Sequence, residues 1–153
     1  MQVNYINPVL DSLVNVLGTM AAMKVRPGKP SIKTEQSARG DVTGVMSMFG
    51  PAARGSIAIT FTAPVILELA QRMLRETYPG INEMVVDLAG EITNMVIGGA
   101  KAKLEEQGHK FDMSLPTLVA GANHIVMHKT QGKTVIMPFE TDYGSFFVEL
   151  CFE

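Results

Sequence analysis

The sequence has little cysteine: only Cys151 occurs among its 153 residues. A single cysteine cannot close a disulfide within the chain, and a chain without disulfides is typical of a reducing compartment. We therefore expect a cytoplasmic protein, in which Cys151 is a small buried residue on the last strand.

Charge is also scarce, since 18% of the residues are charged and the formal net charge is -2. Nucleic acids and anionic membranes attract clustered positive charge, so we expect neither as a partner. No apolar run approaches the roughly 18 residues of a membrane span, and the N-terminal region lacks the positive segment of a secretory signal. The hydrophobic content of 46% predicts one globular domain over residues 1–153.

Apolar residues recur at helical spacing in three segments of the first two thirds of the chain. Each segment is bounded by residues that typically begin or end helices. The first is predicted to run from about Pro8 to Ala22. The boundary signals are Asn7-Pro8 for the first helix, Thr62-Ala63-Pro64 and Tyr78-Pro79-Gly80 for the second, and Asn82 and Gln107-Gly108 for the third.

Strand-like patterns lie on both sides of this helical middle, after a breaker-rich link at 26–30. DVTGVMSMF and SIAITFT predict one hairpin, joined by GPAARG. After Pro116 the runs TLVAGANHIVM, KTVIMPF and SFFVELCF follow, with KTQGK and ETDYG as predicted hairpin turns. Because strands do not alternate with helices, we predict an α+β fold with a mostly antiparallel sheet of about five to six strands packed against long helices.

The third helix carries a narrow polar line on an otherwise apolar surface. On a helical wheel this polar stripe consists of Asp87, Glu91, Asn94, Gly98, Lys101 and Glu105. The solvent-facing edge of an ordinary helix explains such a stripe, and Lys101 with Glu105 fits that view. Asn94 and Gly98 fit it less well, because asparagine is mediocre in a helix and glycine costs about 1 kcal/mol relative to alanine.

The two glycines of this helix point in different directions. Gly98 belongs to the polar stripe, where it bares backbone that another molecule could approach. Gly99 points inward, and we expect it to let the helix pack closely on the sheet.

A glutamate and an asparagine one turn apart lack the parts of a complete active site. The stripe offers no nucleophile, metal cage or histidine base. An amide can hold a water molecule by donating and accepting hydrogen bonds, and phosphoryl transfer depends mostly on positioning and charge stabilisation. The stripe therefore indicates one half of an active site, and we expect a partner protein to supply the other half.

The stripe resembles the signature of the CheC/CheX/FliY phosphatases of bacterial chemotaxis, and the order of elements is most similar to CheX. That signature is Asp or Ser, three residues, Glu, two residues, Asn, about 21 residues and Pro. The matching positions in this sequence are Asp87, Glu91, Asn94 and Pro116.

This resemblance implies an enzyme that hydrolyses the aspartyl-phosphate of a CheY-like response-regulator receiver domain, in chemotaxis or another two-component pathway. Glu91 would form a salt bridge with the regulator's lysine, and Asn94 would orient the attacking water. Mg²⁺ would be held by the receiver, with no metal or cofactor on this chain. Asp87 would support the helix start, and Pro116 would position the next strand. The resemblance also implies a homodimer formed through the sheets.

Some relatives carry a second active helix at the N-terminus. The equivalent positions here are Asp11, Asn15 and Gly18. Asparagine replaces the glutamate and glycine replaces the asparagine, so we predict one active site per chain.

Other patterns are weaker. His124 and His128 would lie about 13 Å apart on a strand, too far to share a zinc ion. QGKT at 131–134 lacks the first glycine of a phosphate-binding loop and predicts a turn. The alternative function is a non-catalytic module that binds receiver domains as a scaffold.

Overall fold

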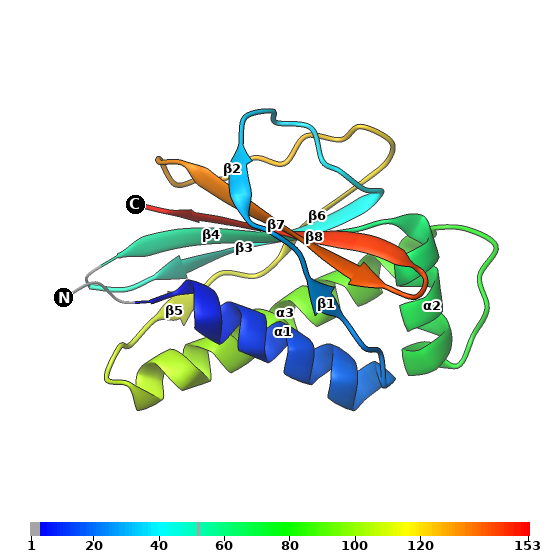
Figure 1. Ribbon diagram of the computed structural model, residues 1–153, viewed down its shortest axis with the longest axis horizontal. Helices are drawn as coiled ribbons and strands as arrows, with labels where there is room; N and C mark the ends of the chain where they lie inside the picture. The colour runs from blue at the N-terminus through cyan, green and yellow to red at the C-terminus, as the bar shows by residue number, and fades with distance from the viewer. Residues whose placement is uncertain (1–3, 52) are drawn as a thin grey trace.

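The computed structural model describes residues 4–51 and 53–153 and confirms the α+β class. In this described part, an antiparallel sheet is covered on one face by α1 and α3, which run in opposite directions, while α2 lies at one end (Figure 1). No helix among these residues is long and apolar enough to cross a membrane.

The structure contains three helices and eight strands among its described residues. The helices are α1 (Ile6–Ala21), α2 (Ala63–Leu74) and α3 (Glu83–Glu106). The strands are β1 (Arg26–Pro27), β2 (Ser31–Lys33), β3 (Val42–Phe49), β4 (Arg54–Phe61), β5 (Asp112–Met113), β6 (Thr117–Ala120), β7 (Thr134–Thr141) and β8 (Gly144–Phe152).

The sheet is larger than predicted. Its order is β1-β7-β8-β4-β3-β5, with β2 also paired to β7 and β6 also paired to β3. The described residues thus form eight strands rather than about five to six. The difference comes from β1, β2 and β5, which are two or three residues long and too short to show a pattern of their own.

The two faces of the sheet carry different side chains, as strand β4 shows. Ile57, Ile59 and Phe61 are fully buried and belong to the main core beneath the helices. The alternate residues Ser56 and Thr60 point to the outer face, because successive side chains of a strand point in opposite directions. The large apolar side chains therefore gather between the sheet and the helices.

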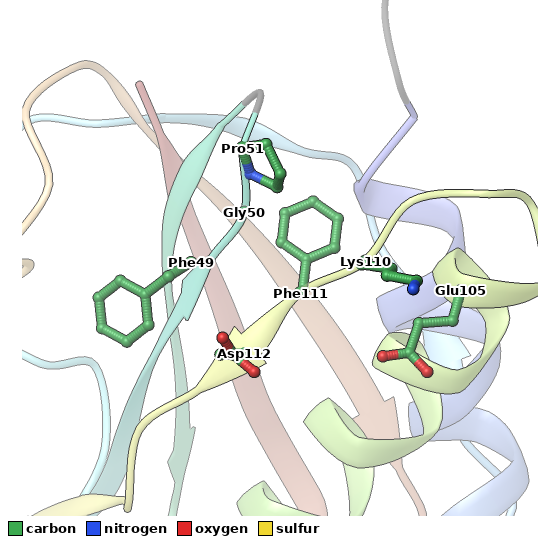
Figure 2. A pocket seen from close by; sticks show the side chains of 7 residues that line it. All are labelled: Phe49, Gly50, Pro51, Glu105, Lys110, Phe111 and Asp112. Carbon is green, nitrogen blue, oxygen red and sulfur yellow. The ribbon is translucent and has the colours of Figure 1, made fainter.

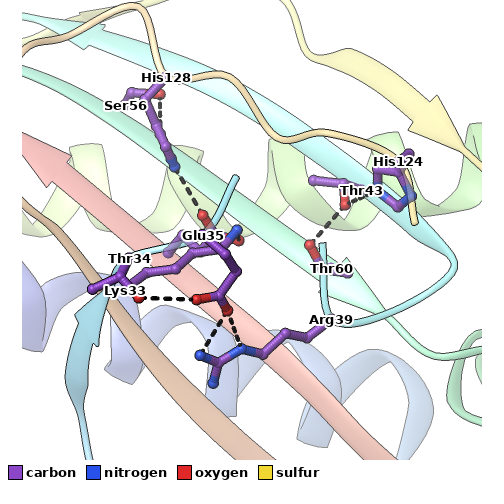
Figure 3. Close-up of polar contacts among 10 residues, drawn as sticks. Lys33, Thr34, Glu35, Arg39, Thr43, Ser56, Thr60, His124 and His128 are labelled. Atoms are coloured by element: carbon purple, nitrogen blue, oxygen red, sulfur yellow. Dashed lines mark hydrogen bonds and ion pairs between the residues drawn. The ribbon is translucent and has the colours of Figure 1, made fainter. Parts of the chain in front are cut away.

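The outer face carries a buried polar network instead (Figure 3). The Lys33 ammonium lies 2.8 Å from one oxygen of Glu149, and a ring nitrogen of His128 lies 3.1 Å from the other. The second ring nitrogen of His128 lies 2.7 Å from the Ser56 hydroxyl. These contacts hold β2 and the loop after β6 against the sheet.

Helix α3 approaches the sheet closely at Gly44 of β3. A Cβ atom at Gly44 would overlap the side chain of Thr93 on α3. The Thr93 hydroxyl is buried and donates to the Ala89 carbonyl at 2.7 Å. The absence of a side chain at Gly44 therefore allows α3 to lie close to β3.

The first helix begins earlier than predicted, at Ile6 rather than Pro8, and Asn7 is not its cap. Asn4 accepts hydrogen bonds from the backbone N–H groups of Ile6 and Asn7, both at 3.1 Å. The helix ends near Ala22 as predicted, because Ala22 adopts the left-handed conformation with φ 49°.

The second helix is capped from a distance. Thr62 precedes it as predicted, but its hydroxyl donates to a carbonyl of β8. Asp41 instead accepts the hydrogen bond of the Ala63 N–H at 2.7 Å. The helix ends where Arg75 adopts φ 61°, which is before the predicted stop at Tyr78-Pro79-Gly80.

Two of the three predicted hairpins are confirmed, β3–β4 and β7–β8. The hairpin through KTQGK is wrong, because β6 pairs with β3 rather than β7. Only the first four residues of TLVAGANHIVM form a strand. Gly121 and Asn123 then take φ values of 121° and 57°, which turn the chain out of the strand.

Candidate functional site

Helix α3 positions the polar stripe. The Asn82 side chain accepts a hydrogen bond from the Val85 N–H at 3.0 Å, which confirms the predicted cap. The buried residues of the helix are Val85, Leu88, Ala89, Gly90, Ile92, Thr93, Val96, Ile97, Ala100 and Leu104. Asp87, Glu91, Asn94 and Glu105 are exposed, whereas Gly98 and Lys101 are partly buried. The prediction of a buried helix with one polar edge is therefore confirmed.

The C-terminal part of the stripe is an ordinary solvated helix surface. Lys101 donates to Glu105 at 2.8 Å. This hydrogen bond raises the pKa of Lys101 above its ordinary value. Both charges are thus satisfied within the chain.

The N-terminal part of the stripe is different. Within the described part of the chain, the side chains of Asp87, Glu91 and Asn94 form no hydrogen bond or ion pair. Another helical acid, Glu68, pairs with Arg72 at 2.7 Å. Residues three apart on a helix have Cβ atoms about 5–6 Å from each other, so Glu91 and Asn94 can contact one partner together.

The environments of the two glycines explain their different roles. A Cβ atom at Gly98 would meet nothing within 4 Å. At Gly99 it would overlap the hydroxyl of Ser12 on α1, which donates to the Val96 carbonyl at 2.6 Å. The expectation that Gly99 allows close packing on the sheet is wrong, because the neighbour is α1. Gly98 leaves open space beside Asn94.

Pro116 lies directly before β6, at the sheet edge that runs beside α3. Leu118 of β6 pairs with Gly44 and packs over Gly90, where a Cβ atom would come within 2.9 Å of it. Pro116 is partly buried. Pro116 therefore adjoins the strand that borders α3 and is not part of the polar stripe.

A shallow groove of about 370 Å³ adjoins Glu91, and the sequence reasoning missed it. We call it the methionine groove; it is lined by Met20, Met73, Leu74, Met84, Asp87, Leu88, Glu91 and Met95. Its walls come from the ends of α1 and α2 and the beginning of α3. Eleven methionines in the sequence were the available signal, but only the fold brings these four together.

Arg72 holds the walls of this groove in place. Its guanidinium donates to the carbonyls of Ala21 and Ala22 at 3.1 and 3.0 Å, at the end of α1. It also pairs with Glu68 and donates to the Tyr143 hydroxyl at 3.0 Å. The hydrogen bond to Glu68 raises the pKa of Arg72 above its ordinary value, so this link stays charged.

A second hollow, of about 460 Å³, lies at the other end of α3 (Figure 2). Phe49, Lys110, Phe111 and Asp112 line it together with Glu105. Glu105 is already paired with a lysine. None of Asp87, Glu91 and Asn94 lines this hollow.

The N-terminal counterpart of the stripe lies on the exposed side of α1. Asp11 is paired with Lys103 at 3.1 Å, and Asn15 accepts a hydrogen bond from Thr19 at 3.4 Å. Gly18 has open space around it. These residues share a face, as predicted, but their acid and amide are engaged within the chain.

The histidines lie away from the stripe. His124 contacts the Thr43 hydroxyl, and His128 belongs to the network on the outer face. Among the described residues, no three His, Cys, Asp or Glu side chains gather where they could hold a metal ion. Cys151 is buried on β8, as predicted.

Comparison with known proteins identifies the family. Residues 42–140 match the family model described as chemotaxis phosphatase CheX. This segment contains β3 to β6, α2, the whole of α3 and β7 without its last residue. The chain belongs to the CheX family, which confirms the predicted resemblance to the CheC/CheX phosphatases.

Three relatives extend this assignment. The crystal structure of chemotaxis protein CheX from Vibrio vulnificus is 50% identical with a TM-score of 0.89, covering 97% of this chain and 99% of that one. The CheY-P phosphatase CheX of Thermotoga maritima is 25% identical, over 79% of this chain and 78% of that protein. A CheX–CheY–BeF₃–Mg²⁺ complex from Borrelia burgdorferi is 25% identical with a TM-score of 0.82, covering 99% of each chain.

Proposed function

We propose that this protein is a phosphatase that accelerates hydrolysis of the aspartyl-phosphate of a CheY-like receiver domain. The observation that carries the proposal is the exposed pair Glu91 and Asn94, which lack partners within the described chain and lie one turn apart on a rigid helix. The relatives named as a CheY-P phosphatase and as a CheX–CheY complex support the same assignment.

In the proposed mechanism, Glu91 pairs with a lysine of the receiver and sets the register of the two proteins. Asn94 then enters the receiver's site and holds a water molecule with its amide. The water oxygen attacks phosphorus, the bond to the aspartyl oxygen breaks, and the released phosphate retains the protons of the water. Mg²⁺, bound by the receiver, stabilises the charge on the phosphoryl oxygens.

The supporting residues have separate roles in this proposal. The expectation that Asp87 supports the helix start is wrong, because α3 begins at Glu83, which is the acid of its first turn, and Asp87 lies in the second turn. Asp87 instead adds an exposed negative charge one turn before Glu91. Gly98 leaves space for the receiver's backbone beside Asn94. Pro116 positions β6, the strand that borders α3.

Substitution of Asn94 tests the mechanism. Asn94→Ala should lower the rate constant for receiver dephosphorylation by on the order of 100-fold, because the water loses its orienting amide. Asn15→Ala on α1 is the matched control and should leave the rate unchanged. The measurement is loss of phosphate from a phosphorylated receiver domain.

Glu91→Ala should mainly weaken receiver binding and also lower turnover, because the salt bridge sets the register. Equal rates for wild type and Asn94→Ala would refute the proposed role of Asn94. Receiver binding without any acceleration by the wild type would instead indicate the non-catalytic scaffold.

We also propose that the protein is a homodimer paired through the β6 edge of the sheet. The opposite edge is interrupted by Pro27 and Pro30 and carries Arg26 and Lys29, features that hinder strand pairing. Beside β6, Leu115 is 87% exposed. An exposed leucine next to an edge strand favours pairing with a second copy.

A further inference from the structure

Several large apolar side chains of the methionine groove are exposed to solvent. Met20 is 51% exposed and Met84 is 53% exposed, on two different helices that face one trough. Met95 and Leu88, which are less exposed, also line it. Methionine is flexible and polarizable, and it adapts well to the apolar surface of a partner. Exposed apolar patches of this kind typically mark interaction sites.

The charge of the groove restricts its occupant. Its lining contains two acids, Asp87 and Glu91, and no basic residue. Neither acid has a hydrogen-bond or ion-pair partner within residues 4–51 and 53–153. A second copy of this chain docked groove to groove would bring like charges together. An apolar surface with an accompanying lysine or arginine is complementary to both features.

The groove is continuous with the proposed catalytic edge. Glu91 belongs to both, and Met95 directly follows Asn94 on α3. A protein that contacts Glu91 and Asn94 together must therefore also cover part of the groove.

The shape of the groove fits a helix. Along α3 it extends from Met84 to Met95, about 16 Å at the rise of an α-helix. This length matches about three turns, which present an apolar stripe at positions i, i+3 or i+4, and i+7. The contacts of Arg72 with the end of α1 keep the opposite wall fixed.

We propose that the methionine groove binds an amphipathic, basic helix of the receiver domain beside its phosphoaspartate and thereby selects which receivers are substrates. This inference rests on the proposed phosphatase function. Met20 and Met84 supply binding energy that is equal in the ground state and the transition state, so they determine KM. Asn94 orients the attacking water, and Glu91 sets the register in which it does so.

The test replaces the two exposed methionines by glutamine, which has similar helix propensity. Met20→Gln combined with Met84→Gln should raise the KM for a phosphorylated receiver about tenfold and leave kcat within about twofold. Met127→Gln is the matched control, because Met127 is 72% exposed but lies on the loop after β6. It should change neither constant.

Binding separates this inference from the proposed function. The affinity for a receiver domain loaded with BeF₃⁻ and Mg²⁺ should fall about tenfold in the double variant, even if the wild type released no phosphate. An unchanged KM and an unchanged affinity, with Asn94→Ala still inactive, would overturn the groove inference and leave the phosphatase function in place.

Opposite charges at one position test the basic character of the partner helix. Met84→Lys should weaken binding to the BeF₃⁻-loaded receiver more than Met84→Glu does, and the difference should shrink in high salt. Equal effects would contradict a basic partner. A shift of Met20→Gln/Met84→Gln from dimer to monomer, with receiver affinity retained, would assign the groove to a second copy and overturn the inference.

Discussion

At the residue scale, Gly98 is the position where stability and function are expected to oppose each other. Nothing lies within 4 Å of a Cβ atom placed there, so alanine fits without a clash. Alanine is also the better helix former by about 1 kcal/mol. A glycine at this position therefore costs stability that the chain could recover with a single methyl group.

Gly98→Ala should raise the free energy of unfolding by about 1 kcal/mol. It should also lower the dephosphorylation rate roughly tenfold or more, because the methyl group displaces the receiver from the position in which Asn94 acts. Urea denaturation and phosphate release measure the two effects. Gly18→Ala on α1 is the control, since its site is equally open; it should stabilise without slowing the reaction. A stabilised Gly98→Ala protein with full activity would show that no partner approaches here.

At the element scale, the short strand β2 depends on a buried ion pair. The side chains of Lys33 and Glu149 are 3% and 1% exposed, and they join β2 to β8 across β7. Removing one member of such a pair leaves an uncompensated buried charge, which typically costs 3–5 kcal/mol, whereas removing both charges costs much less.

Lys33→Met should therefore lower the free energy of unfolding by about 3–5 kcal/mol. The double variant Lys33→Met/Glu149→Gln should be more stable than Lys33→Met alone, because glutamine is uncharged and still accepts a hydrogen bond from His128. Chemical denaturation of wild type, both single variants and the double variant gives the coupling between the two positions. Additive effects would mean that the pair does not act as a unit.

The elements that the sequence predicted are those with local signals. Helix α3 has its cap in Asn82 and an apolar periodicity over 24 residues, and the hairpin β7–β8 turns within a few residues. The strand after Pro116 was predicted too long because Gly121 and Asn123 could not be assigned positive φ values from pattern alone. The strands β1, β2 and β5 were missed because strands of two or three residues take their conformation from the neighbour with which they pair.

The candidate site also combines features with a local sequence signal and features that only the fold creates. Glu91 and Asn94 were predictable because a helix places residues three and four apart on one face. The methionine groove was not, because Met20 and Met84 are 64 residues apart in sequence and meet only when three helices pack together. The contact of Asp41, just before β3, with the first residue of α2 is a further contact of this non-local kind.

At the scale of the whole molecule, the proposed dimer can be tested by substituting Leu115. Its exposure of 87% means that a charge there costs the monomer little. Leu115→Glu should increase the dissociation constant of the dimer at least about tenfold, because each interface buries two new carboxylates. Sedimentation equilibrium measures this constant.

Ile32→Glu provides the comparison, because Ile32 is 51% exposed on β2 at the opposite edge of the sheet. It should leave the association unchanged. Dissociation by Ile32→Glu instead of Leu115→Glu would place the interface at the wrong edge for this proposal.

Within the described residues, Glu91 and Asn94 have no hydrogen-bond or ion-pair partner, and this also has an evolutionary consequence. Because neither side chain supports the fold, either can be replaced with little selection against the folded protein itself. In the proposed scheme, an enzyme and a passive receptor for the same signalling protein then differ by one inherited substitution. A lineage could cross between the two in either direction while the docking surface, and with it the partner, is retained.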